Sequence, residues 1–245
     1  PSFGSNGRVY IAYTFEGDAT NPTGPKTAQV IRVNANTPSG DVANPATKLV
    51  LLGSATGSAT KPSCDVRVTG VSTSGVWTTG VWGLPSPPSP PTANAHQLSV
   101  GDTLTLASAI GGAVPSIRAG DYVVSDVFST TTFKVTGIPS LTAAGGSGSI
   151  TKKDSDCIPS DGWSHSIGNL KFGPDGMLYV ATGDASSYFT TDPLAFRTQS
   201  VDRLSGKLLR VNHANGQGLA DNPFYAGNLS ATRSKVWAYG VRNAF

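Results

Sequence analysis

The stretch His165–Asp184, HSIGNLKFGPDGMLYVATGD, contains two short apolar runs that are separated by Gly173–Gly176 (GPDG). In this tetrapeptide Pro presets φ and the last Gly adopts positive φ at little cost, so the sequence favours a β-turn. The runs on either side then form two antiparallel strands. Because the turn lies midway, His165 and Asp184 are expected together at the opposite edge of the sheet.

The same punctuation recurs along much of the chain. Runs rich in strand-forming residues and bounded by Gly, Asn or Pro predict strands at Arg8–Thr14, Ala28–Val33, Lys48–Leu52, Gly168–Phe172, Met177–Thr182, Lys207–Val211 and Lys235–Tyr239. No segment keeps apolar residues at a helical spacing, and the 245 residues include 29 Gly and 17 Pro. The fold class predicted from the residues is therefore all-β.

Short strands separated by turns are typical of the four-stranded blades of a β-propeller. The expected propeller segments are residues 1–65 and 154–245, which at roughly 40–50 residues a blade amount to about three blades. A six-bladed ring needs more chain, so the remaining blades are expected from further sequence or from another chain. The chain opens at Pro1 instead of Met, which favours a processed or partial chain.

Residues 66–153 differ in composition and are expected to form a small β-domain inserted between two propeller strands. A Pro-rich run, Leu84–Pro91, and a Gly-rich run, Ala143–Ser149, are expected as extended or flexible flanks. Alternating runs predict strands at Asp102–Leu106, Asp121–Val127 and Thr132–Val135. The surrounding pattern resembles small β-barrel modules found as inserts in phage and surface proteins, which implies a binding or spacer role.

Cys64 and Cys157 stand just before and just after this segment. A compact insert leaves and re-enters its parent domain at neighbouring points, so the two cysteines are expected within disulfide distance. Low charge and abundant Ser, Thr and Gly favour export, where such a pair oxidises. The expected location is secreted, periplasmic or at the cell surface. The alternative is two distant thiols, with the insert tethered only by its flanks.

Charge and hydropathy exclude several classes of function. The net charge is +3, with both signs scattered along the chain, so no nucleic-acid-binding surface is predicted. Apolar runs are far shorter than the roughly 18 residues of a membrane span. Neither cysteine lies in a Cys/His cluster, so no metal site is expected among these residues.

His165 and Asp184 are the strongest candidates for chemistry. An imidazole and a carboxylate at one rim suit proton abstraction, because the carboxylate orients the ring and stabilises its cationic form. Three further motifs follow in order: Gly206–Arg210 (GKLLR), Asn222–Phe224 (NPF) and Gly240–Asn243 (GVRN). This order of motifs resembles the pyrroloquinoline-quinone (PQQ) dependent sugar dehydrogenases of the glucose/sorbosone dehydrogenase family, closely over the last third of the chain and loosely over its first quarter.

The resemblance implies a partial six-bladed β-propeller and a quinoprotein oxidoreductase that converts an aldose or related sugar to its lactone by hydride transfer to the quinone. It implies that His165 is the general base and that Asp184 is its supporting carboxylate. Arg242 would place positive charge beside the quinone oxygens, and Asn243 would hydrogen-bond the cofactor. An external electron acceptor is also implied, as is calcium with ligands outside this chain.

Two other functions stay open at this point. Propellers of this family include ectodomains without catalysis, so carbohydrate or protein binding is one alternative, and a structural surface or filament protein is the other. Ala244 stands where the family usually has Pro. Asp175 and Lys207 are assigned to structure, whereas His96 and His213 are expected at the surface. The tryptophans are expected to be packing residues and not a stacking platform: Trp77, Trp82, Trp163 and Trp237.

Overall fold

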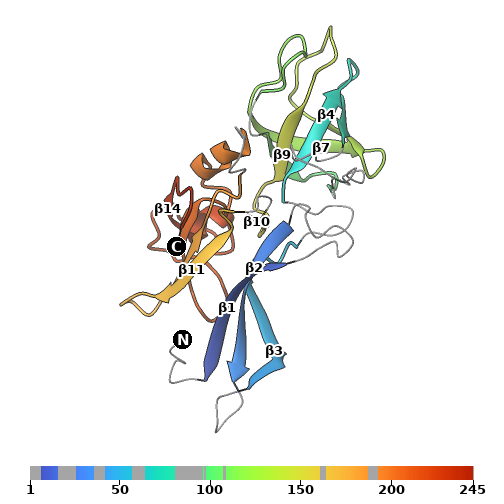
Figure 1. Ribbon diagram of the computed structural model, residues 1–245. Coiled ribbons are helices and arrows are strands. Elements are labelled where there is room, and N and C mark those ends of the chain that lie inside the picture. Colours follow the sequence, from blue (N-terminus) through green and yellow to red (C-terminus); the bar gives the residue numbers. More distant parts are fainter. Residues whose placement is uncertain are drawn as a thin grey trace.

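The computed structural model describes residues 7–15, 26–35, 42–56, 64–80, 96, 98–106, 109–160, 164–186 and 193–244. Within these ranges the protein consists of strands and two short 3-10 helices, which confirms the all-β prediction. Figure 1 shows two sheets with a barrel at one end of them. Neither helix has the length and apolar character of a membrane span.

The elements in chain order are β1 (Arg8–Phe15), β2 (Lys26–Ala35), β3 (Ala43–Leu52), β4 (Val66–Val71), β5 (Val76–Thr79), β6 (Thr103–Leu106), β7 (Gly120–Val127), β8 (Thr132–Val135), β9 (Gly148–Lys152), β10 (Ile158–Ser160), β11 (Ile167–Phe172), β12 (Leu178–Thr182), η1 (Pro193–Gln199), β13 (Lys207–Val211), η2 (Thr232–Lys235) and β14 (Val236–Tyr239). Every strand predicted from the sequence is present. The strands β4, β5, β9 and β10 are additional.

The first sheet is organised around β2. Strand β1 pairs with β2 along its whole length. On the other edge β3 pairs with residues 30–35 of β2, and β10 pairs with residues 26–28. The chain therefore leaves the sheet after β3 and returns to the same edge as β10. Gly53 makes the exit possible, because a Cβ there would lie 2.2 Å from the carbonyl oxygen of Ala28.

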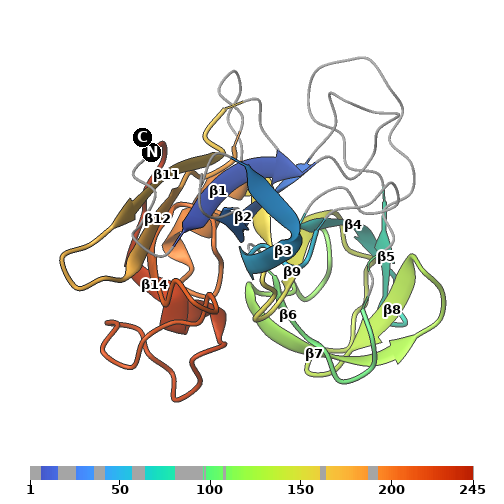
Figure 2. The same ribbon diagram turned by 90° about the horizontal axis from the view of Figure 1, so that it is seen from below.

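The second sheet is an antiparallel meander in the order β11-β12-β13-β14. The GPDG turn joins β11 to β12, and its Gly176 has a φ of 73°, which suits glycine. The two sheets pack face to face, as Figure 2 shows from below. Their shared core contains Val30 and Leu52 from the first sheet and Val180 and Leu209 from the second. All the strands described outside the barrel belong to these two four-stranded sheets, whereas the length of the two propeller segments suggested about three blades.

The stretch between β3 and β10 contains a closed barrel in the order β4-β5-β8-β7-β6-β9. It has a hydrophobic core of its own, separate from that between the sheets. The largest members of this core are Trp77 and Phe133, both fully buried. The barrel is therefore a packed unit and not an irregular loop.

The expectation of a flexible Gly-rich flank is wrong. Strand β9 begins at Gly148, inside the Ala143–Ser149 run, and Gly145 forms a backbone bridge with Val71. A Cβ on Gly148 would lie only 3.0 Å from Ile110. The missing side chains let this run pass close to the barrel core, so the glycines serve packing. The Pro-rich run lies outside the described residues.

Two histidines differ from their expected exposure. His96 is 2% exposed, because it packs on the barrel core with its ring centre 5.0 Å from that of Phe133. Its Nδ1 accepts a hydrogen bond from the backbone N–H of Leu98 over 2.9 Å. His213 is half-buried, and its Nδ1 lies 2.9 Å from the hydroxyl of Tyr10. Each histidine thus contacts a strand of the fold: His96 packs on Phe133 of β8, and His213 meets Tyr10 of β1.

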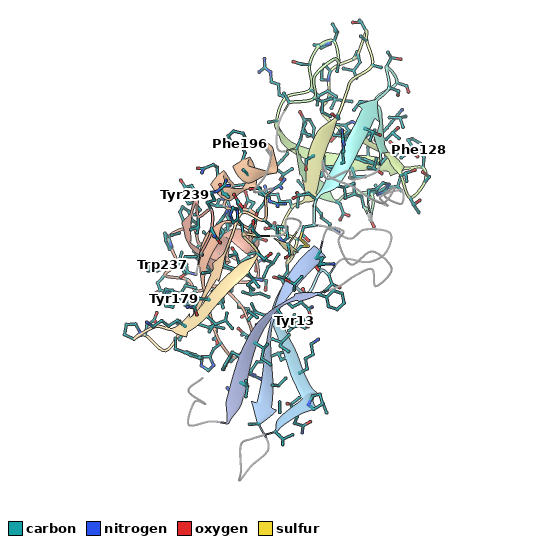
Figure 3. All side chains as sticks on the ribbon, viewed as in Figure 1. Tyr13, Phe128, Tyr179, Phe196, Trp237 and Tyr239 are labelled. Atoms are coloured by element: carbon teal, nitrogen blue, oxygen red, sulfur yellow. A yellow bond between two sulfur atoms is a disulfide. The ribbon has the colours of Figure 1, made fainter. Side chains whose placement is uncertain are left out.

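The tryptophans divide into two groups. Trp77 packs in the barrel core as expected, whereas Trp237 on β14 is 39% exposed. Figure 3 shows Trp237 with Tyr179 and Tyr239 along the outer side of the second sheet. The guanidinium of Arg210 lies 5.1 Å from the Trp237 ring centre, within cation–π range. Trp82 and Trp163 lie outside the described residues.

The predicted disulfide is confirmed. Cys64 and Cys157 are bonded, with their Cα atoms 5.7 Å apart. The bond joins the chain just before β4 to the chain just before β10. It therefore ties the entrance and the exit of the barrel together next to the first sheet.

Candidate functional site at the ends of β11 and β12

His165 and Asp184 lie side by side beyond the paired ends of β11 and β12. Ile167 pairs with Thr182, so the residues before one strand and after the other are neighbours. The Nδ1 atom of His165 lies 2.9 Å from Oδ1 of Asp184, and the two side chains are 6% and 2% exposed. Oδ1 also accepts the backbone N–H of Ser186 over 3.0 Å. Nδ1 therefore carries the imidazole hydrogen, and Nε2 is the basic nitrogen.

Close backbone packing fixes this pair. The backbone N–H of Ala185 donates to the carbonyl oxygen of His165 over 2.9 Å. A Cβ on Gly183 would lie 2.1 Å from that same oxygen, so only glycine fits. His165 and Ala185 have φ values of 58° and 49°, a left-handed conformation that costs residues with a side chain about 1–2 kcal/mol. Strain of this kind concentrates at functional sites.

The segment after β14 brings Arg242 and Asn243 to the same rim. The backbone N–H of Asp184 donates to the carbonyl oxygen of Arg242 over 2.9 Å. Nη1 of Arg242 lies 3.6 Å from Oδ2 of Asp184, and 60% of the Arg242 side chain is exposed. This distance is an electrostatic contact and exceeds that of a good hydrogen bond. The guanidinium can therefore donate to a second acceptor in front of the rim.

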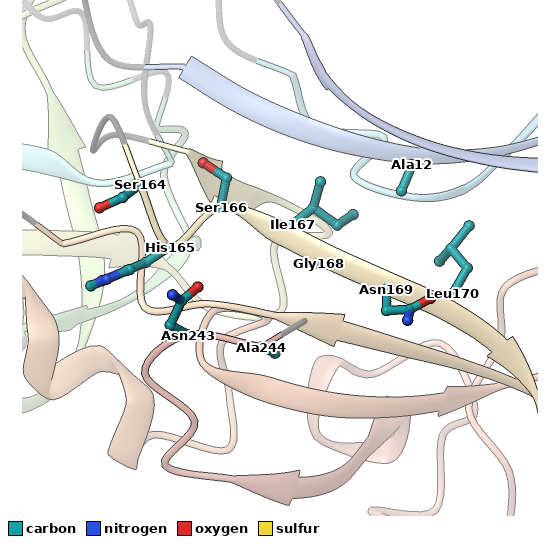
Figure 4. A pocket seen from close by; sticks show the side chains of 10 residues that line it. All are labelled: Ala12, Ser164, His165, Ser166, Ile167, Gly168, Asn169, Leu170, Asn243 and Ala244. Atoms are coloured by element: carbon teal, nitrogen blue, oxygen red, sulfur yellow. The ribbon is translucent and has the colours of Figure 1, made fainter.

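An open pocket of about 840 Å³ lies beside this rim and follows β11. Residues 164–170 line it together with Ala12, Asn243 and Ala244. Figure 4 shows His165 and Asn243 toward one end of the pocket and Leu170 at the other. The volume lies within the roughly 300–1,000 Å³ that is typical of ligand pockets. The four residues singled out from the sequence thus gather at one rim beside a cavity of ligand size.

A buried charged cluster behind the rim was not predicted from the sequence. Asp65 accepts hydrogen bonds from Nη1 of Arg197 and Nη1 of Arg203, each over 2.6 Å, and from Oγ1 of Thr151. Burial would raise the pKa of Asp65, but the guanidinium groups of Arg203 and Arg197 lower it to about 2. Asp65 is therefore a buried carboxylate at neutral pH. Its arginine partners lie 132 and 138 residues away along the chain, so no local pattern reveals the cluster.

Lys207 of the GKLLR motif belongs to the framework behind the site. Its side chain is fully buried, and Nζ donates to the carbonyl oxygens of Thr198 and Ser205 over 2.9 and 2.6 Å. A third carbonyl oxygen, that of Arg197, lies at 3.4 Å. Burial and the positive charges of Arg203 and Arg197 lower the pKa of Lys207 to about 7.

Arg210 of the same motif joins two other sequence motifs, the GPDG turn and the NPF motif, to each other. Its Nε donates to Asp175 of the GPDG turn over 2.7 Å. Its Nη1 donates to Asp221 and to Asn222 of the NPF motif, each over 2.8 Å. Asp175 and Lys207 therefore make structural contacts, in line with their assignment. Among the described residues, no group of three or more His, Cys, Asp and Glu side chains is arranged to hold a metal ion.

Comparison with known proteins links the last part of the chain to one family. Residues 154–245 match the Glucose / Sorbosone dehydrogenase family. Aldose sugar dehydrogenase YliI of Escherichia coli (strain K12) is 35% identical over 80 residues, which are 33% of this chain and 19% of that protein. The chain thus matches about a fifth of the length of this relative.

A solved structure, the PQQ-bound form of aldose sugar dehydrogenase from Streptomyces coelicolor, aligns with 97% of this chain and 56% of that chain. The two sequences are 18% identical over this alignment, and the TM-score is 0.27. A score this low supports no conclusion about the fold.

Proposed function

We propose that this chain is part of a PQQ-dependent sugar dehydrogenase, because residues 154–245 match the Glucose / Sorbosone dehydrogenase family and 80 residues of the chain are 35% identical to an aldose sugar dehydrogenase. The reaction is the oxidation of an aldose or related sugar to its lactone, with the electrons passed on to an external acceptor. The observation that carries the proposal is the buried His165–Asp184 pair at a pocket that Asn243 also lines.

In this proposal the two sheets are blades of a six-bladed propeller. Residues 1–65 and 154–245 supply the blades, and residues 66–153 are an insert with a binding or spacer role. The exit and return of the chain at one edge of β2 support an insert, since β3 and β10 share that edge. The Cys64–Cys157 disulfide supports export to a secreted, periplasmic or cell-surface location, because such bonds persist in oxidising compartments.

The residues at the rim fit an anionic quinone. Arg242 offers a guanidinium with most of its side chain exposed, and Asn243 offers amide donors at the pocket wall. These groups would hold the carbonyl and carboxylate oxygens of PQQ, since charge-assisted hydrogen bonds of arginine suit such acceptors. When bound, PQQ supplies the acceptor for the hydride of the sugar. The calcium expected from the resemblance has no assigned ligand among the described residues.

His165 is the proposed general base. Nε2 takes the proton of the sugar hydroxyl at the carbon that is oxidised, while Nδ1–H stays hydrogen-bonded to Asp184. The resulting imidazolium is stabilised by the adjacent carboxylate. Arg242 adds positive charge at the same rim, where negative charge develops during the reaction. Each of these contributions acts in the chemical step and not in sugar binding alone.

The test is aldose-dependent reduction of a dye by the complete protein with PQQ and calcium. His165→Gln should lower turnover by about 10²–10⁴-fold, while the dissociation constant for PQQ changes little, because the base acts in the chemical step. Lys171→Gln is the matched control: Lys171 lies on β11 but does not line the pocket, and its loss should leave turnover unchanged. Folded wild-type protein that neither binds PQQ nor reduces the dye would instead support a non-catalytic binding or structural propeller.

A further inference from the structure

Arg197 connects the candidate site to the barrel. Its side chain is 1% exposed. Nε donates to the carbonyl oxygen of Asp184 over 2.8 Å, and Nη2 donates to that of Ala185 over 2.7 Å. On the other side, Nη1 donates to Oδ2 of Asp65 over 2.6 Å. One guanidinium thus binds the two peptide groups that follow Asp184 in the chain and, at the same time, the Asp65 carboxylate beside the disulfide.

The two peptide groups that Arg197 binds need these hydrogen bonds to keep their conformation. Ala185 has a left-handed φ of 49°, which costs about 1–2 kcal/mol and persists only where the surroundings hold it. This conformation turns the N–H of Ser186 back onto Oδ1 of Asp184, the oxygen that contacts His165. Relaxation of the turn would therefore move the carboxylate away from the imidazole.

Asp65 in turn holds Arg197. A guanidinium this deeply buried is costly without a counter-ion, and Asp65 is itself 2% exposed. Asp65 directly follows Cys64 and directly precedes β4 of the barrel. Thr151 on β9, the last barrel strand, donates a further hydrogen bond to Asp65. Both ends of the barrel therefore fix the carboxylate that orients Arg197.

We propose that Arg197 is a positioning residue for Asp184, and that Asp65, at the base of the barrel, holds the guanidinium of Arg197 in the orientation that this role requires. Arg197 does not line the pocket, so it acts through Asp184 and not on a ligand. The inserted barrel is then part of the architecture of the site, because Asp65, directly before its first strand, and Thr151, on its last strand, hold the arginine that sets the His165–Asp184 contact. The effect on turnover rests on the proposed dehydrogenase function, whereas the effect on the contact does not.

Arg203 provides the matched control. It donates to the other oxygen of Asp65 over 2.6 Å and its side chain is 6% exposed, but the two groups that bind the Asp184 and Ala185 carbonyls are Nε and Nη2 of Arg197. Arg203→Met should therefore lower stability while leaving the His165–Asp184 contact in place. Arg197→Lys keeps the positive charge but cannot donate to three acceptors in the plane of a guanidinium. Asp65→Asn keeps the shape of the side chain and removes its charge.

The first measurement is the proton NMR signal of Nδ1–H of His165 in the complete protein, assigned by its loss in His165→Gln. Arg197→Lys and Asp65→Asn should weaken or abolish this signal, and Arg203→Met should retain it. An unchanged signal in Arg197→Lys, or no such signal in the wild type, would overturn the proposal. This readout is independent of whether the protein oxidises any sugar, so failure of the proposed function is recognised separately.

The second measurement is a steady-state comparison of turnover and KM in the variants and the wild type. Turnover in Arg197→Lys should fall by about 10–100-fold, with KM little changed. A stability loss in Arg197→Lys with wild-type turnover and KM would make Arg197 merely structural and contradict the proposal.

Discussion

Lys207 shows how a single residue can make stability depend on pH. Its amine is buried among carbonyl oxygens, two arginines lie nearby, and within the described part of the chain no acidic side chain accepts a hydrogen bond from it. Burial and these arginines lower its pKa from the ordinary 10.5 to about 7. Between these two pH values the unfolded chain holds a proton on Lys207 that the folded protein has lost. The free energy of unfolding must therefore rise with pH over this range.

We predict that this rise reaches about 1.4 kcal/mol per pH unit between pH 7 and pH 10. The measurement is denaturant unfolding of the wild type and of Lys207→Met at a series of pH values. The variant should lack the contribution, whatever its absolute stability, because Met does not titrate. Parallel curves for the two proteins would show that the amine of Lys207 is charged in the folded state throughout.

At the scale of elements, the barrel closes through a glycine run. Gly146 donates its backbone N–H to the carbonyl oxygen of Gly111 over 2.7 Å. A Cβ on Gly146 would lie 2.9 Å from that oxygen, whereas a Cβ on Gly111 would meet nothing within 4 Å. Two glycines on either side of one hydrogen bond thus differ in the space available to a side chain.

Gly146→Ala should therefore destabilise the barrel by about 1–3 kcal/mol, as expected when a close-packed site is overfilled. Gly111→Ala should be neutral or slightly stabilising, because it restricts the unfolded chain without a clash. Thermal unfolding of the two variants beside the wild type checks both expectations. Equal melting temperatures for the two variants would contradict the role given to the glycine run.

Most strands that the sequence predicts pair with a strand close in sequence, although β4 and β5, which also pair with each other, were not predicted. β11, β12 and β13 pair in succession, and turn residues bound each of them. β10 escapes the pattern because it has three residues, includes Pro159, and pairs with β2 far earlier in the chain. β9 starts with Gly148 and Ser149 and becomes a strand only because β4 and β6 flank it in the closed barrel. Such strands are defined by tertiary pairing and not by local preference.

At the scale of the whole molecule, the junction of barrel and sheets is held by several bonds at one place. Beside the Cys64–Cys157 disulfide, Asp156 accepts hydrogen bonds from Ser54 over 2.7 Å and from Lys235 over 3.0 Å. The backbone N–H of Ala55 donates to the carbonyl oxygen of Asp156 over 3.0 Å. The outgoing and returning chain therefore run side by side, next to the second sheet.

Loss of the disulfide should weaken this junction measurably. The bond closes a loop with a sequence separation of 93, for which the chain-entropy account gives about 4–5 kcal/mol of stabilisation. The double variant Cys64→Ser, Cys157→Ser should unfold at correspondingly lower denaturant concentration than the oxidised wild type. Reduced wild-type protein is the control and should behave like the variant. Peptide mapping that finds free thiols in the oxidised wild type would refute the bond itself.

The site could be predicted from the sequence only in part. His165 and Asp184 could be predicted as neighbours because the GPDG turn fixes which residues face each other at the far end of the strand pair. The contact between Arg197 and Asp65 could not be predicted, because barrel closure and the disulfide bring together segments that are 132 residues apart. The position of Arg242 followed from motif order, but its contact with Asp184 depends on how the chain turns after β14.

The central claim, that the rim of His165, Asp184, Arg242 and Asn243 is a quinone site, is tested most directly by calorimetric titration of PQQ into the complete, calcium-loaded protein. We predict one PQQ bound per chain and a dissociation constant that rises by about 10-fold or more in Arg242→Gln, which loses the charged donor at the rim. Lys171→Gln should bind PQQ as the wild type does. Folded protein that binds no PQQ, or binds it equally well with and without Arg242, would contradict the claim.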